Sequence, residues 1–143
     1  MKRKALVLVL VLVLSVVASA AAAAQELVVY STIFAGYAEA MKNEFERQNP
    51  GVTVHVINPG GTEAMISRLL AERDNPRADV MHSGGSTEYA YAKSMGLLQP
   101  TDMSNIDIPE FIELGDGLLP TRDDEGYYFV WSVLFTGFMI NVD

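Results

Sequence analysis

Three short polar stretches carry the side chains of this chain that are best suited to ligand binding. They are Ser31-Thr32, Gly61-Thr62 and His82-Ser83-Gly84. Each one directly precedes a segment that we expect to be helical. Hydroxyls and backbone N–H groups at a helix start bind anionic oxygens, helped by the positive end of the helix dipole. We therefore predict an anion-binding site where the three helix starts converge.

Each stretch also has a purely structural interpretation. Serine and threonine are common helix caps, and paired glycines suit a turn that needs positive φ. His82 is open to three roles, as a ligand donor, a metal ligand or a structural residue. Because it directly follows an apolar strand, we expect it to point into the cleft as a donor. His55 falls in the middle of a strand and receives no functional role.

The elements that position these residues alternate between strand and helix. Strands are predicted at residues 27–31, 52–57 and 78–81, each followed by a helix. This order predicts an α/β fold with a doubly wound parallel sheet, whose ligands bind at the carboxyl ends of the strands. Two helices have predicted inner stripes, and a third has a predicted cap at Ser86. The stripes are Tyr37, Ala38, Met41 and Phe45, then Met65, Ile66, Leu69 and Leu70.

The chain is less regular after residue 100. We expect Pro109 to open a short helix and the acidic residues 123–125 to form a solvated turn before a strand at residues 127–131. Tyr127 and Tyr128 are expected to pack against the sheet. Trp131, the single tryptophan, is expected to line the ligand cleft.

Residues 1–24 have the pattern of a secretory signal peptide. A basic start precedes an apolar run at residues 5–17, and small residues at 18–20 or 22–24 suit cleavage. An uncleaved anchor is the alternative, because the apolar stretch approaches spanning length. We expect cleavage and a periplasmic location. The chain has no cysteine, which excludes disulfides and a cysteine-linked lipid anchor.

Charge and motif content narrow the function classes. Without residues 1–24 the chain holds 7 basic and 18 acidic residues, a net charge of −11. This balance argues against binding to nucleic acid or to an anionic membrane. Nucleophile-elbow, zinc-protease and phosphate-loop motifs are absent from the sequence. We therefore expect a protein that is not an enzyme and that uses no cofactor and no metal.

The order and spacing of several motifs resemble a known family. They are the glycine turn at residues 60–62, D-N-P-x-A-D-V at residues 74–80, the polar loop at residues 82–86 and G-L-L-x-P at residues 96–100. Together they resemble the type II periplasmic solute-binding proteins of ABC importers, in the group that binds ferric iron or small organic anions. The resemblance extends from Leu27 to Asn141 and covers nearly all of the mature chain.

The resemblance implies a two-lobed protein that closes on its solute about a hinge. Residues 25–131 would be the N-terminal α/β lobe, and residues 132–143 the start of a crossover strand into a second lobe that is missing here. We thus expect an N-terminal fragment that binds solute weakly or not at all alone. The implied partners are a small-molecule solute and an inner-membrane permease, with the protein itself a monomer.

The same resemblance bears on the solute. Related iron binders use a histidine after the first strand, a carboxylate after the third and two tyrosines from the second lobe. This chain has Thr32 and His82 at the first two places, so we expect a small anionic or polar organic solute. A ferric-iron-binding transport protein and a solute-sensing lobe of a signalling system are the alternatives.

Overall fold

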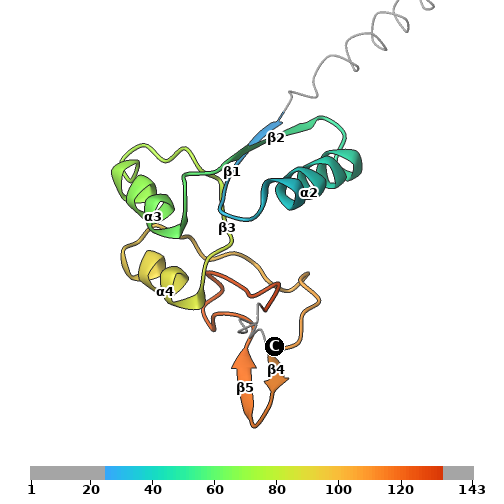
Figure 1. Cartoon of the computed structure of the whole chain (residues 1–143), viewed down its shortest axis with the longest axis vertical. Helices are drawn as coiled ribbons and strands as arrows, with labels where there is room; N and C mark the ends of the chain where they lie inside the picture. The colour runs from blue at the N-terminus through green and yellow to red at the C-terminus, as the bar shows by residue number, and fades with distance from the viewer. Residues whose placement is uncertain (1–24, 134–143) are drawn as a thin grey trace, which may run out of the picture. The chain divides into compact units, whose positions relative to one another are not determined.

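The computed structural model describes residues 25–133 as a mixed α/β chain with three helices and five strands (Figure 1). The described residues form two compact units. The first holds residues 25–65 and 74–83, and the second holds residues 66–73 and 84–133. No helix within the described range is long and apolar enough to cross a membrane. The predicted signal peptide and most of the predicted crossover strand, residues 134–143, lie outside the described residues.

The first unit contains a parallel three-stranded sheet in the order β2-β1-β3. Strand β1, Gln25–Ser31, pairs with β2, Val52–Ile57, on one side and with β3, Val80–His82, on the other. The chain thus winds outward in both directions from a central strand, as the alternating pattern predicts. The bounds of β2 are those predicted. Within β2 Val54 is buried, while its neighbour His55 is exposed.

Strand β3 begins and ends later than predicted. Asp79 precedes it and already pairs with β1, because its N–H donates to the Val28 carbonyl at 2.9 Å and its Oδ2 accepts the Val28 N–H at 2.8 Å. His82 is therefore the last residue of the strand and not the first residue of the loop. It is the register partner of Ser31.

Helix α2, Ala35–Gln48, lies against β2 but with a different face from the one predicted (Figure 1). Of its predicted inner stripe only Ala38 is buried, and the three larger side chains are exposed. Their exposed fractions are 66% for Tyr37, 45% for Met41 and 43% for Phe45. The row of residues 38, 42 and 46 faces the sheet instead, and Glu46 Oε1 accepts the N–H of Val54 at 2.7 Å.

Helix α3, Thr62–Ala71, buries the face that its sequence predicts. Met65 is 0% and Ile66 8% exposed, and Leu69 and Leu70 are half-buried. The boundary between the two units falls between Met65 and Ile66.

Helix α4, Ser86–Ser94, belongs to the second unit. It begins one residue earlier than predicted, because Ser86 was expected to be its cap. Gly85 is the cap, with extended backbone angles, and it makes no side-chain capping bond. Ser86 is already helical, so its predicted role as the cap is wrong. Past the helix end, Gly96 takes a φ of 68° while Leu97 N–H donates to the Ala92 carbonyl, which ends the helix as a glycine after its last turn should.

A hairpin replaces the helix predicted at Pro109. Strands β4, Phe111–Leu114, and β5, Gly117–Pro120, are antiparallel. The two-residue connection Gly115-Asp116 includes a φ of 57° at Gly115, which favours a tight hairpin over a helix. The strand predicted at residues 127–131 is also wrong, since the described chain has there only an isolated bridge between Arg122 and Phe129.

Candidate functional site

The carboxyl ends of β1 and β3 bring two of the predicted polar stretches together. Ser31 and His82 are paired in the sheet register, and Ser31 Oγ lies 2.9 Å from His82 Nδ1. One residue further along each chain, Thr32 N–H donates to Ser83 Oγ at 2.9 Å, and the two hydroxyl oxygens are 2.6 Å apart. We call these four residues, Ser31, Thr32, His82 and Ser83, the clasp.

The backbone at Ser83 is unusual for a residue that is not glycine. Its φ is 66°, in the left-handed region, and Gly84 follows with a φ of 118°. Such a conformation is unfavourable for a serine and persists where surrounding contacts hold it. Here the two hydrogen bonds to Thr32 provide that support. The loop after β3 is therefore fastened to the loop after β1.

The next helix start in the same unit is that of α3. Gly60 and Gly61 have φ values of 99° and 136°, and Asn58 Oδ1 accepts the Gly60 N–H at 2.8 Å. The first amides of α3, from Thr62 onward, have no acceptor within the helix and can donate to an anion. Glu63 in the first turn opposes this, because its carboxylate competes for the positive end of the helix.

The structure divides the predicted site residues between the two units. Ser31, Thr32, His82 and Ser83 form the clasp, and Gly61 and Thr62 lie in the same unit. Gly84 and Trp131 belong to the second unit, where Trp131 is 48% exposed. The predicted convergence of all three helix starts stays a prediction.

Burial separates the clasp into inner and outer residues. Ser31 is only 1% exposed, and the Nε2 atom of His82 is also buried. Thr32 and Ser83 are half-buried and keep part of their surface open. The outer pair can therefore reach a solute without rearrangement.

The Ser31–His82 bond has the geometry of a nucleophile and its base. A reacting carbonyl cannot approach a hydroxyl that is 1% exposed, so this arrangement does not support nucleophilic catalysis. That the chain is not an enzyme stays a prediction. Within residues 25–133, no group of three or more His, Cys, Asp or Glu side chains is placed to hold a metal ion.

Burial lowers the pKa of the His82 imidazole below its ordinary value of 6.5. As pH falls below that value, the unfolded chain therefore binds more protons than the folded chain, and the free energy of unfolding decreases. We expect urea denaturation of the protein to show this loss of stability between pH 7 and pH 5. His82→Asn should reduce this loss of stability. An equal loss in the His82→Asn variant would contradict the assignment.

A second cluster, in the second unit, was not predicted. Lys93 Nζ contacts Asp123 Oδ1 at 2.8 Å and Glu125 Oε1 at 3.1 Å, and it lies 4.8 Å from the centre of the Tyr127 ring. Asp123 is 11% exposed, so the acidic turn is anchored to α4 and is solvated only at Asp124 and Glu125. We call Lys93, Asp123, Glu125 and Tyr127 the Lys93 cluster.

The neighbouring aromatic residue Tyr128 packs against Tyr89 of α4, whereas the sequence predicted packing against the sheet. The rings of Tyr89 and Tyr128 lie 5.4 Å apart in a tilted arrangement. Burial raises the pKa of Tyr89 to about 12, so its hydroxyl remains protonated at physiological pH.

A hollow of about 520 Å³ lies elsewhere on the first unit, and it contains no clasp residue. Its walls come from β1, α2 and β2 and include Val28, Lys42 and His55. Its lining mixes both charge signs with valines and has no feature that favours one ligand.

Comparison with solved structures gives a likeness to a periplasmic binding protein. The chain is similar to the solved structure of the periplasmic binding protein AfuA from Actinobacillus pleuropneumoniae, which holds exogenous fructose-6-phosphate. The two share 29% sequence identity over 61% of this chain, with a TM-score of 0.55, and the match spans 27% of the AfuA chain. No protein-family model and no curated protein sequence matches. The likeness supports a general relationship between this chain and the periplasmic binding proteins.

Proposed function

We propose that this chain supplies one solute-contacting wall of an extracytoplasmic solute-binding subunit of an ABC importer. The single observation that carries the proposal is the clasp at the carboxyl edge of a parallel sheet, in a chain similar to a periplasmic binding protein. Solute capture in such a protein needs closure around the ligand, and the closed form then docks on a permease. The neighbour's location also supports a periplasmic setting.

The proposed solute is a small organic anion. One of the Thr32 and Ser83 hydroxyls keeps a hydrogen to donate, since the other donates within the pair. The first amides of α2 and α3 are further donors, and none of these groups carries a fixed positive charge. Such donors suit a phosphate or carboxylate oxygen better than a hard trivalent cation. Fructose-6-phosphate, the compound held by AfuA, is therefore a suitable first ligand to test.

The test is a nuclear magnetic resonance titration of the chain with fructose-6-phosphate. We expect weak binding that shifts the amide signals of Thr32, Ser83 and Thr62, with much smaller shifts from fructose alone. Thr32→Val should weaken binding about 5- to 10-fold, the worth of about one hydrogen bond. Thr53→Val, at an exposed position on β2, is the matched control and should have no effect.

Two results would count against the proposal. Equal shifts from fructose and fructose-6-phosphate would remove the role of the anionic group. Selective broadening of the clasp signals by ferric iron, with no response to the sugar phosphate, would favour the iron-binding alternative.

A further inference from the structure

The Ser31 hydroxyl is enclosed, so its hydrogen must reach an acceptor nearby. The side chain is 1% exposed, and its oxygen has two described neighbours. The Ile33 N–H lies 3.4 Å away and can only donate. His82 Nδ1 lies 2.9 Å away and is able to accept. Since a buried hydroxyl hydrogen without an acceptor is unfavourable, the hydrogen goes to Nδ1.

This placement determines the protonation of the imidazole. A ring whose Nδ1 accepts a hydrogen bond is neutral and carries its proton on Nε2. Burial acts in the same direction, because it lowers the pKa of His82 and favours the neutral ring. In this form neither nitrogen offers a lone pair to a metal ion, because Nδ1 is engaged and Nε2 is protonated.

The consequence reaches the next residues along both strands. Ser31 and His82 are register partners at the ends of β1 and β3, and Thr32 and Ser83 follow them directly. The Ser31–His82 bond thus lies one residue from the bonds by which the Thr32 N–H and hydroxyl meet Ser83. Because those bonds support the left-handed backbone of Ser83, a shift of the two strand ends would act on that backbone directly.

We propose that Ser31 and His82 are a positioning pair, in which Nδ1 of a neutral His82 accepts the Ser31 hydroxyl and thereby holds Thr32 and Ser83 for the solute. The pair itself stays beneath the solute and does not touch it. The part that concerns the solute rests on the proposed function. The tautomer of His82 does not depend on it.

The first test reads the tautomer directly from the nitrogen signals of the two imidazoles in ¹⁵N-labelled protein. His55→Gln removes one of the two histidines and so assigns the other. At pH 7.5 we expect a bare Nδ1 and a protonated Nε2 for His82, unaffected by added ferric iron. A protonated Nδ1, an imidazolium, or selective broadening of the His82 signals by ferric iron would overturn the proposal.

The second test uses conservative replacement at the same two positions. His82→Asn places an amide oxygen near the position of Nδ1 and should keep the affinity for fructose-6-phosphate within about 3-fold. His82→Gln cannot place its oxygen there and should weaken it about 10-fold, as should Ser31→Ala. Equal losses from the Asn and Gln variants would overturn the positioning role. If fructose-6-phosphate does not bind the parent protein, that result counts against the proposed function. The tautomer measurement still shows whether His82 Nδ1 accepts the Ser31 hydroxyl.

Discussion

Replacing Tyr30 with alanine is expected to destabilise the sheet of the first unit strongly. Tyr30 is 0% exposed in the middle strand β1, where its register partners are Ile57 on β2 and Met81 on β3. Tyr30 thus lies in the middle strand between paired residues of both neighbouring strands. Truncation of a large buried aromatic side chain removes its burial and leaves a cavity, at a cost of about 3–5 kcal/mol. That is a large part of the 5–15 kcal/mol by which a typical domain is stable.

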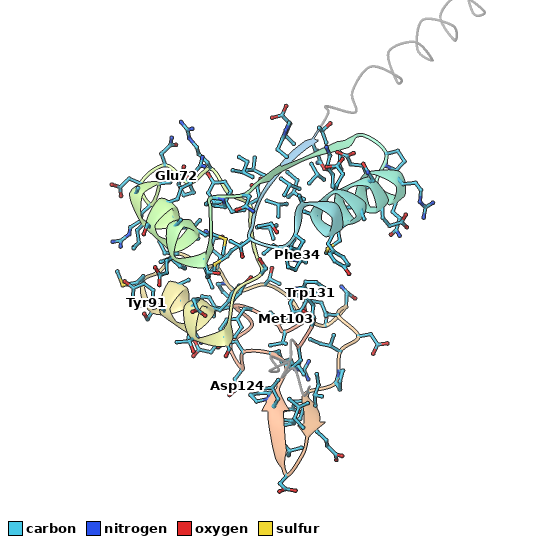
Figure 2. The ribbon with its side chains drawn as sticks, in the orientation of Figure 1. Phe34, Glu72, Tyr91, Met103, Asp124 and Trp131 are labelled. Atoms are coloured by element: carbon cyan, nitrogen blue, oxygen red, sulfur yellow. The ribbon has the colours of Figure 1, made fainter. Side chains whose placement is uncertain are left out.

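The measurement is urea denaturation, with hydrogen exchange of the β1, β2 and β3 amides to locate the loss. Phe34→Ala is the matched control, because this aromatic residue beside the start of α2 is 80% exposed (Figure 2). Its loss should change stability by less than about 0.5 kcal/mol. A cost below about 1 kcal/mol for Tyr30→Ala would show that β1 is not the centre of this core.

The strands of the first unit were predictable because their signal is local. Val54 faces inward and His55 outward, and this period of two is visible in the sequence without knowledge of the fold. Parallel pairing then brings the ends of β1 and β3 together, so the proximity of Ser31 and His82 also follows from the pattern. The burial of Ser31 does not follow from the pattern, because it depends on which residues cover the end of the strand.

One error concerns a contact that lies outside the element it affects. The face of α2 that meets β2 includes Glu46, which accepts a bond from the backbone of Val54. No hydrophobic pattern within the helix contains that information, and the pattern of Tyr37, Met41 and Phe45 points the other way. The error at the β4–β5 hairpin is different, because its signal is local. Gly115-Asp116 between apolar residues indicates a hairpin, but Pro109 was interpreted as the start of a helix over the same segment.

The Lys93 cluster shows most clearly that a local sequence pattern does not indicate contacts between distant residues. Lys93 and Asp123 are 30 residues apart, and nothing near either residue indicates its partner. Yet the contact explains the fold of the acidic turn. Asp123 Oδ2 also accepts the N–H groups of Glu125 and Tyr127, at 3.1 and 3.2 Å, so a single carboxylate organises the turn and ties it to α4.

Replacing Lys93 with methionine should therefore destabilise the second unit. Burial raises the pKa of the Asp123 carboxyl, but the bonds from Lys93 and from the Tyr127 and Glu125 amides outweigh it and lower the pKa overall. Methionine keeps the aliphatic length and removes the cation, which leaves an 11%-exposed carboxylate with its two backbone N–H donors but without a counter-charge. Because Lys93 is 24% exposed, the pair is only partly buried, so we expect a loss of stability larger than that of an exposed surface pair and smaller than that of a fully buried one.

Two further variants separate charge compensation from simple packing. Glu125→Gln removes the other carboxylate, which is 70% exposed, and should cost less than about 0.5 kcal/mol. Asp123→Asn combined with Lys93→Met removes the carboxylate charge that Lys93→Met alone leaves without a partner cation. The double variant should therefore be more stable than the sum of the two single losses predicts. Urea denaturation of the parent, Lys93→Met, Asp123→Asn and the double variant gives the coupling. Additive losses would mean that Lys93 contributes through the contact of its ammonium with the Tyr127 ring, and the ion pair would then have no part in holding the turn.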